Sequence, residues 1–197
     1  GHGIDPETCR TFIRPHDDRR GLDVVSVASH RRVKNHRALL RGVARAIADG
    51  HDIHVRVIGD GPLRHANERF AESLGIPDRV TFESARPDVL DCIATADVFV
   101  LSSDAEGQPL VLLEAMAVGT PVIATAVGRA PTLLEHGAGE LVAPGDWRGI
   151  ADRLGRLSTE PARRDELRRA ALAAVAPHTV ARAVDEHRRL YASLSDR

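Results

Sequence analysis

The chain has 197 residues, 43% of them hydrophobic and 28% charged, which is the composition of an ordinary globular protein with one substantial core. Because 27 Lys and Arg residues balance 28 Asp and Glu residues, no overall field attracts nucleic acid or an anionic membrane, and we expect no nucleic-acid partner. No apolar run in these residues approaches the ~20 residues of a membrane-spanning helix.

From residue 23 onward, short β-branched runs alternate with longer amphipathic segments, a pattern typical of repeated βαβ units. The predicted strands lie at 23–29, 53–59, 79–84, 98–103, 121–126 and 139–143. The predicted helices lie near 35–49, 62–74, 87–96, 109–118 and 129–136. We therefore predict a Rossmann-like, doubly wound α/β domain with a parallel sheet of about six strands.

The helix predicted near 109–118 has the clearest ends in the sequence. Pro109 suits the first helical position, and Gly119-Thr120-Pro121 ends the helix before the next strand. After residue 145 the strand pattern stops, and one helical face is defined by Trp147, Ile150, Leu154 and Leu157. Arg- and Ala-rich helices are expected to follow as a helical tail to about Leu194.

Polar residues crowd the ends of the first and fourth predicted strands. In an open parallel sheet, ligands bind beyond the carboxyl ends of the strands where the strand order reverses, usually between these two strands. The loop after Ser29 is cationic and contains Arg31 and Lys34, whereas the loop after Ser103 carries carboxylates, including Glu106. We expect the two loops to face one another across a ligand-binding crevice.

The second loop leads straight into a helix, whose free amides near Leu110 and Val111 and positive dipole end favour a phosphate. Arg31 and Lys34 could contact the same phosphates from the opposite side, because Arg offers a planar fork and Lys a point charge. These features predict a ligand that contains a diphosphate.

Two carboxylates, Glu106 and Glu114, have no obvious role in a phosphate site because they repel phosphate. They suit hydroxyl groups instead, as an acidic residue does with ribose in dinucleotide sites. Glu114 lies among apolar residues, where an unpaired charge is costly, so it needs a ligand or a buried partner. A nucleotide sugar satisfies both the phosphate-binding and the hydroxyl-binding features.

Residues 106–117, EGQPLVLLEAMA, followed by Gly119-Thr120-Pro121-Val122, resemble the E-x7-E signature of family 4 retaining glycosyltransferases, which are GT-B enzymes. Further segments resemble the family in the same order over nearly the whole chain: Gly59-Asp60-Gly61-Pro62-Leu63, Val127-Gly128 and 139–146. The resemblance implies the C-terminal, donor-binding half of such an enzyme. It also implies a missing N-terminal half that binds the acceptor and through which any peripheral contact with a membrane would be made.

Carried over by residue, the resemblance implies that Glu114 binds the ribose hydroxyls and Glu106 faces the donor sugar. It implies that Lys34 holds the diphosphate, with Arg31 in place of the arginine that many members carry at the position of Ser29. We expect Glu106, Lys34 and Arg31 to act in catalysis. The further expected substrate-binding residues are Gly107, Gln108, Pro109, Leu110, Val111 and Arg86.

Two segments depart from the family pattern. Residues 82–86 correspond to the segment that contacts the nucleotide base in the family, but they lack its usual glycine. The nucleotide of the donor could therefore be UDP, GDP or ADP. The acidic residue that commonly follows the V-G-G-x-P stretch is Thr132 here. The resemblance divides the chain into an interdomain lead-in at 1–20, a Rossmann-like donor-binding domain at 21–177, and a helix at 178–197 that crosses to the missing domain.

The remaining motifs favour no cofactor besides the donor. Gly59-Asp60-Gly61 fails as a dinucleotide fingerprint, since Arg64 occupies the third glycine position, and is interpreted as a strand-to-helix turn. The closest histidine pairs lack the partners of a metal site, and we expect no metal. Two distant cysteines, Cys9 and Cys92, favour a reducing compartment and a cytoplasmic location.

The function predicted from these features is retaining transfer of a sugar from a nucleoside diphosphate sugar to an unknown acceptor. We expect the isolated chain to be nearly inactive without the acceptor-binding half. Two alternatives remain from the sequence: a non-catalytic, regulatory module that binds a nucleotide sugar in the same crevice, and a sugar-nucleotide epimerase.

Overall fold

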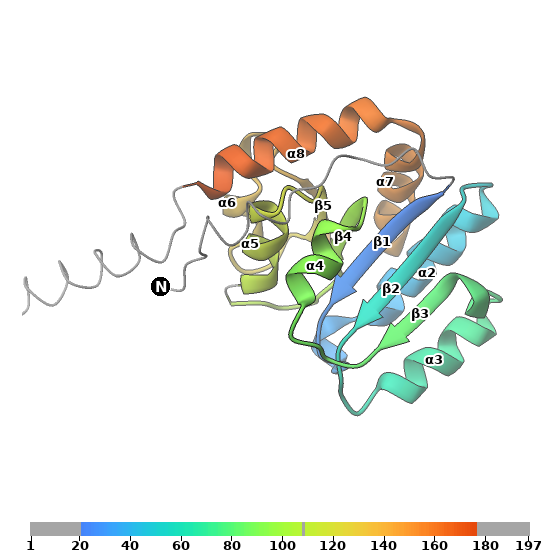
Figure 1. Ribbon diagram of the computed structural model, residues 1–197. Helices are drawn as coiled ribbons and strands as arrows, with labels where there is room; N and C mark the ends of the chain where they lie inside the picture. Colours follow the sequence, from blue (N-terminus) through green and yellow to red (C-terminus); the bar gives the residue numbers. More distant parts are fainter. Residues whose placement is uncertain (1–20, 108, 177–197) are drawn as a thin grey trace, which may run out of the picture.

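The computed structural model describes residues 21–107 and 109–176, and its core is one parallel β-sheet (Figure 1). The strands are β1 (Leu22–Val27), β2 (Ile53–Ile58), β3 (Val80–Glu83), β4 (Val98–Leu101), β5 (Val122–Thr125) and β6 (Glu140–Val142). Their spatial order is β3-β2-β1-β4-β5-β6, and all five neighbouring pairs are parallel. The predicted Rossmann-like fold is confirmed, and the strand order reverses between β1 and β4 as expected.

Helices connect these strands. The α-helices are α2 (His36–Ala48), α3 (Arg64–Ser73), α4 (Val89–Ala94), α5 (Leu110–Ala117), α6 (Ala130–Leu133), α7 (Trp147–Thr159) and α8 (Pro161–Val175). Short 3-10 turns form η1 (Arg32–Lys34), η2 (Pro77–Arg79) and η3 (Glu135–Gly137). The helix predicted near 129–136 is therefore interrupted, because His136 adopts a left-handed conformation between α6 and the next strand. The lead-in at 1–20 and the terminal helix at 178–197 lie outside the described residues.

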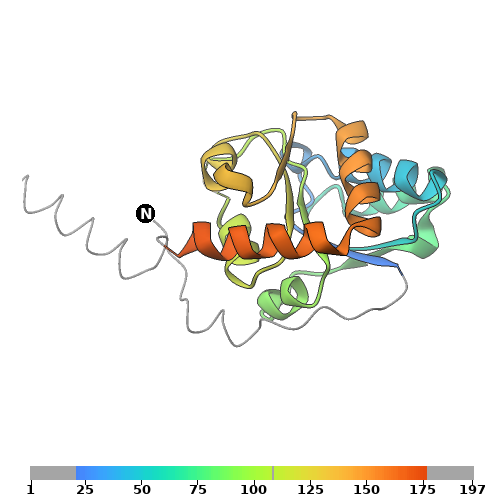
Figure 2. The same cartoon turned by 90° about the horizontal axis from the view of Figure 1, so that it is seen from above.

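The sheet is covered on both faces, and its strands alternate accordingly. Val24 and Val25 are neighbours on β1 but belong to two different buried clusters, because successive side chains of a strand point to opposite faces. One cluster packs the sheet against α2, α3 and α7, and the other packs it against α4, α5, α6 and α8. Figures 1 and 2 show α2 and α4 on opposite faces of the sheet.

The predicted apolar face of α7 is buried as expected. Ile150, Leu154 and Leu157 are fully buried, whereas Trp147 at the start of the helix is only partly buried. Pro109 differs from its prediction by one position: it is the N-cap of α5, with φ −75° and ψ 93°, and the helix begins at Leu110. An extended proline at this position orients the preceding loop before the helical hydrogen bonds begin.

The turn after β2 confirms the interpretation of its glycines as a backbone requirement. Gly59 and Gly61 have φ values of 147° and 153°, and an added Cβ at Gly59 would lie 2.3 Å from the carbonyl oxygen of Ala28. The turn thus packs closely against the backbone that follows β1, and the His30 amide donates to the Asp60 carbonyl at 2.9 Å. Within residues 21–107 and 109–176, no helix is both long and apolar enough to cross a bilayer.

Candidate functional site

The loops after β1 and β4 lie side by side at the carboxyl edge of the sheet, because the two strands are neighbours. Backbone and side-chain hydrogen bonds join the loops. The Asp104 amide donates to the Val33 carbonyl at 2.7 Å, and Ser102 Oγ donates to the Lys34 carbonyl at 3.0 Å. Asn35 Nδ2 donates to Asp104 Oδ1 at 2.7 Å. Residues about 70 positions apart in the chain are thereby held as one structural unit.

The loops also bring together the predicted cation and carboxylate. Lys34 Nζ lies 2.5 Å from Glu106 Oε1, and the two side chains are only 24% and 11% exposed. Ser103 Oγ donates to the same Glu106 oxygen at 2.7 Å. Since the pair is largely removed from water, its attraction is stronger than that of a surface ion pair. The sequence predicted these two loops to face one another, but it did not identify Ser103.

Asn35 determines the conformation of the loop after β1, a role that the sequence did not indicate. It adopts a left-handed conformation, with φ 43° and ψ 48°, which asparagine tolerates better than most residues. Its side-chain oxygen caps α2 by accepting a hydrogen bond from the Ala38 amide at 3.2 Å. The side-chain amide of the same residue donates to Asp104, so Asn35 fixes both the start of α2 and the opposite loop.

Gly128 supports the loop that carries Glu106. Its φ is 53°, and an added Cβ would lie 2.2 Å from the Glu106 carbonyl oxygen and 2.6 Å from that of Gly107. The next residue, Arg129, donates its amide to the Gly107 carbonyl at 3.3 Å. Only glycine permits this close approach of two backbones. In the sequence, the Val127-Gly128 pair was noted only as part of the family resemblance, and nothing indicated its contact with the Glu106 loop.

The start of α5 lies directly after this loop. Leu110 is exposed, Val111 is half-buried, and these residues open the first turn, where backbone amides have no acceptor inside the helix. Gly107 is exposed and Pro109 is buried. The predicted substrate-binding residue Gln108 lies outside the described residues. The exposed helix start next to Lys34 offers positive charge for an anionic ligand.

Glu114 occupies the second turn of α5 in a setting unlike that of Glu106. It is half-buried, and among the described residues no hydrogen bond or ion pair reaches its carboxylate. Burial raises the pKa of Glu114 above its usual value, because water no longer solvates the charged form. A ligand with hydroxyl groups would supply the missing donors.

Arg31 lies beside the Lys34–Glu106 pair without joining it. It is exposed, and among the described residues it forms no ion pair. It lines a cavity of about 430 Å³ between the loop after β1 and α3. The other residues that line this cavity are Arg32, Asn35, His36, Arg37, Leu63, Ala66, Asn67 and Asp104. The structure therefore brings Lys34 and Glu106 into contact and leaves Arg31 next to them, available to a ligand.

Two histidines are buried beneath the cationic loop. The rings of His30 and His36 stack with their centroids 4.4 Å apart, and His30 Nδ1 lies 3.0 Å from Asn67 Nδ2. Burial, followed by the charges of His30 and Lys34, lowers the pKa of His36 to about 4, although the nearby Ala28 backbone opposes this shift. His36 is therefore neutral at physiological pH.

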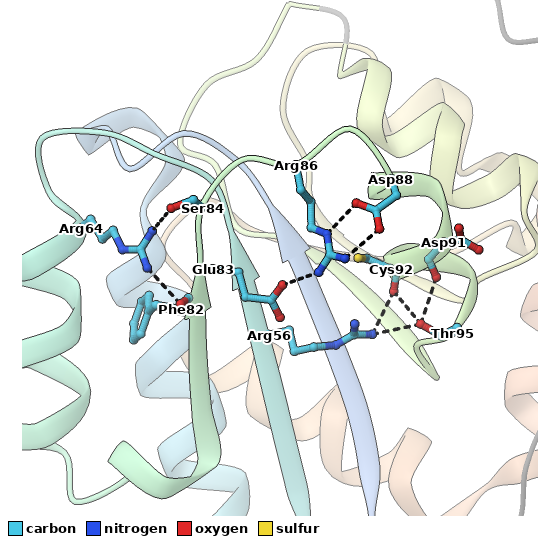
Figure 3. Close-up of polar contacts among 10 residues, drawn as sticks. All are labelled: Arg56, Arg64, Phe82, Glu83, Ser84, Arg86, Asp88, Asp91, Cys92 and Thr95. Carbon is cyan, nitrogen blue, oxygen red and sulfur yellow. Dashed lines mark hydrogen bonds and ion pairs between the residues drawn. The ribbon is translucent and has the colours of Figure 1, made fainter.

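Arg86, the predicted contact at the base-reading segment, is held by its own neighbours (Figure 3). Its guanidinium donates to both carboxylate oxygens of Asp88, at 2.6 and 2.7 Å, and to Glu83 at 2.7 Å. These partners, Asp88 first, raise the pKa of Arg86 above its usual value. Nearby, Arg64 donates to Ser84 Oγ and to the Phe82 carbonyl, which fixes the end of β3. The contact of Arg86 with a base stays a prediction.

In the described ranges, no group of three or more His, Cys, Asp or Glu side chains is arranged to hold a metal ion. The candidate site thus combines the largely buried Lys34–Glu106 pair, a neighbouring arginine and the exposed start of α5, and the half-buried Glu114 lies one turn further along this helix. The arrangement can bind a ligand that is both anionic and rich in hydroxyl groups.

Comparison with known proteins gives consistent matches. The family model described as glycosyl transferases group 1 matches residues 14–173. N-acetyl-alpha-D-glucosaminyl L-malate synthase of Bacillus anthracis is 35% identical over 130 residues, which cover 66% of this chain and 34% of that enzyme. D-inositol 3-phosphate glycosyltransferase of Corynebacterium urealyticum is 36% identical over 161 residues, covering 77% of this chain and 37% of that enzyme.

Among solved structures, the fold is similar to HepE of Anabaena in complex with UDP-glucose, with a TM-score of 0.78 and 22% sequence identity. The superposition covers 90% of this chain and 49% of HepE. The chain therefore spans about half of that structure and about a third of the two curated enzymes it matches.

Proposed function

The chain belongs to the glycosyl transferases group 1 family, and on that premise we propose that its crevice binds a nucleoside diphosphate sugar as the donor for sugar transfer. The contact of Lys34 with Glu106 beside the start of α5 carries this proposal. It puts a cation for a diphosphate and an acceptor for sugar hydroxyls within one site. HepE, which shares the fold, binds UDP-glucose in its crystal structure, and this supports a nucleotide sugar as the ligand.

Each group has a distinct role in the proposed complex. Lys34 and the amides of Leu110 and Val111 hold the diphosphate, and Arg31 reaches it from the neighbouring cavity wall. Glu114 accepts hydrogen bonds from the ribose hydroxyls, which lowers the cost of its burial. Glu106 accepts a hydrogen bond from the donor sugar. No residue in this set requires a metal ion, since the lysine and the helix dipole supply positive charge.

The proposed catalytic contribution is stabilisation of the leaving group. When the glycosidic bond breaks, negative charge develops on the departing diphosphate. In this proposal, Lys34, Arg31 and the start of α5 stabilise that charge more strongly than the charge of the intact donor. The family resemblance implies a retaining outcome, which the anomeric configuration of the product formed by the complete enzyme would establish by NMR.

We also propose that the acceptor binds to a part of the enzyme outside this chain. The chain corresponds to about a third of the length of the two curated relatives. The isolated chain should therefore bind the donor but transfer little sugar. We propose a cytoplasmic location, where nucleotide sugars and reduced cysteines coexist.

Calorimetric titration of the chain with UDP, GDP and ADP tests the donor site. We expect one diphosphate to bind in preference to the others, and its affinity to fall about tenfold or more in Lys34→Ala, because a charge-assisted contact is lost. Glu114→Ala should weaken binding of the same ligand, because the proposed hydrogen bonds from the ribose hydroxyls are lost. Arg45→Ala is the control, since Arg45 is exposed and pairs with Asp49 just after the end of α2. The proposal would be contradicted if all three ligands bound equally weakly and if no variant changed their affinities.

A further inference from the structure

The two carboxylate oxygens of Glu106 have unequal surroundings. Oε1 receives both described donors, Lys34 Nζ at 2.5 Å and Ser103 Oγ at 2.7 Å. Within the described part of the chain, no donor reaches Oε2. Because an ionised carboxylate accepts hydrogen bonds on both oxygens, this geometry leaves Oε2 as the acceptor for a ligand.

The two hydrogen-bond donors, Ser103 and Lys34, also differ in how far their side chains can move. Ser103 is fully buried just beyond β4, and its carbonyl accepts a 2.6 Å hydrogen bond from Thr125 Oγ1, which is equally buried in β5. The backbone that carries its hydroxyl is therefore tied to the sheet. Lys34 is 24% exposed and carries its charge on a flexible four-carbon stem. Only Lys34 can turn toward a diphosphate without moving the backbone.

We propose that Ser103 is a positioning residue that holds Glu106 with Oε2 directed at the donor sugar, and that this makes the site select nucleotide sugars over free nucleoside diphosphates. The inference rests on the proposed function. When Lys34 turns to the diphosphate, Ser103 remains as the described donor on Oε1. A sugar hydroxyl on Oε2 then replaces the hydrogen bond that Lys34 gave up.

A free nucleoside diphosphate lacks that hydroxyl. It must draw Lys34 away from Glu106 without offering the carboxylate any new donor, and its terminal phosphate repels Glu106. An unpaired, largely buried carboxylate is unfavourable, so the Lys34–Glu106 pair opposes this ligand. The same pair would re-form after sugar transfer and favour release of the diphosphate product.

A purely structural role for Ser103 would stabilise the loop and affect every ligand alike, so the test compares two ligands and two serines. Titrations with UDP-glucose and UDP measure the ratio of their dissociation constants. In Ser103→Ala we expect weaker UDP-glucose binding by about three- to tenfold, the effect of one hydrogen bond, with UDP changed less than about twofold. An equal loss for both ligands would overturn the inference.

Ser102→Ala is the matched control. Ser102 is similarly buried at the same strand end, but its hydroxyl donates to the Lys34 backbone instead of to Glu106. Because both ligands carry the diphosphate that Lys34 contacts, this variant should change both affinities by the same factor. A change in the ratio as large as in Ser103→Ala would contradict the assignment of selectivity to Ser103.

A measurement without nucleotide separates failure of this inference from failure of the proposed function. Three-bond NMR couplings across χ1 and χ2 of Glu106 report whether its side chain occupies one rotamer. Because Lys34 also holds Oε1 in the absence of a ligand, the couplings are measured in a Lys34→Ala background. We expect one rotamer in this background, with or without Ser102→Ala, and rotamer averaging when Ser103→Ala is added. Unchanged couplings would overturn the positioning role even if nucleotides bind. Absence of nucleotide binding together with averaged couplings would instead overturn the proposed function and the selectivity, leaving the positioning role intact.

Discussion

Glu106 and Glu114 belong to one short segment of the chain but lie in opposite electrostatic settings. Glu106, in the loop after β4, is 11% exposed and contacts a lysine and a serine hydroxyl. Glu114, in the second turn of α5, is half-buried without a hydrogen-bond or ion-pair partner in the described residues, and its pKa is raised by loss of hydration. One carboxylate has a cationic partner beside it, and the other is pushed toward its neutral form.

The difference shows which part of the crevice is organised before a ligand binds. The loop around Glu106 is fixed by contacts with the turn after β1, with the residues that follow β4 and with β5, so its geometry is set in advance. The Glu114 carboxylate is partly desolvated but receives no hydrogen bond from residues 21–107 and 109–176. In the proposed complex, the sugar would enter a preorganised region, whereas the ribose would complete an unsatisfied one.

Among the substitutions considered, Gly128→Ala should have the largest effect on stability, because it disrupts the loop that carries Glu106. A Cβ at this residue would overlap the Glu106 and Gly107 carbonyls and would also have to adopt φ 53°. We expect a loss of about 3 kcal/mol or more in the free energy of unfolding, measured with urea. Gly75→Ala is the control, because Gly75 has φ 71° but nothing within 4 Å of its added Cβ, and it should cost only about 1 kcal/mol. Equal losses would show that the close approach to the Glu106 loop contributes nothing.

His36 extends the comparison to a buried base. Its pKa is lowered to about 4, mainly by burial, so the unfolded chain binds a proton near pH 6.5 that the folded chain rejects until about pH 4. Stability should therefore fall as the pH falls through this window, by about 2 kcal/mol at pH 5 from this residue alone. His36→Gln, which cannot titrate, should flatten the curve of unfolding free energy against pH. Exchange of the exposed His65 for Gln is the control, and an equal flattening there would contradict the prediction.

Glu114→Gln should sharpen the contrast between the two carboxylates. Because the pKa of Glu114 is raised in the folded chain, ionisation opposes folding, and stability should fall as the pH rises above the usual glutamate range. The neutral variant should be more stable than the wild type at pH 7, and the difference should vanish below about pH 4. Glu106→Gln should have the opposite effect at pH 7, since it leaves Lys34 without its charged partner. Destabilisation by both variants would contradict the comparison.

The arrangement of strands and the proximity of the loops that carry Lys34 and Glu106 could be predicted from the sequence, whereas their direct ion pair was not. Apolar runs located every strand, and the parallel topology places the ends of β1 and β4 together, so residues in both loops had to be neighbours. The position of Glu114 among apolar residues of α5 was also predictable from helical periodicity. These inferences depend on local patterns and on one general rule of sheet topology.

The remaining features depend on tertiary contacts that no local pattern encodes. Asn35 is of a kind that begins helices throughout proteins, and its partner Asp104 lies about 70 residues away. Ser103 lies only three residues before Glu106, but serines end strands so often that this spacing alone did not identify it. Gly128 is required because of a carbonyl more than twenty residues earlier in the chain. His30 and His36 are one of the close histidine pairs that the sequence analysis rejected as a metal site, whereas their stacking results from burial of both rings beneath the cationic loop.

Arg86 should give the smallest effect on stability, because its partners are local and exposed. Glu83 and Asp88 lie within three residues of it, so the ion pairs join no distant parts of the chain, and Arg86→Ala should leave the melting temperature nearly unchanged. Its effect should appear in nucleotide recognition: in titrations of this variant, the dissociation constants for UDP, GDP and ADP should differ less than in the wild type. Arg79→Ala, which removes another exposed arginine paired with Asp52, should keep the preference. An unchanged preference in Arg86→Ala would mean that Glu83 and Asp88 hold the guanidinium away from the base, and that other groups near the end of β3 distinguish the nucleotides.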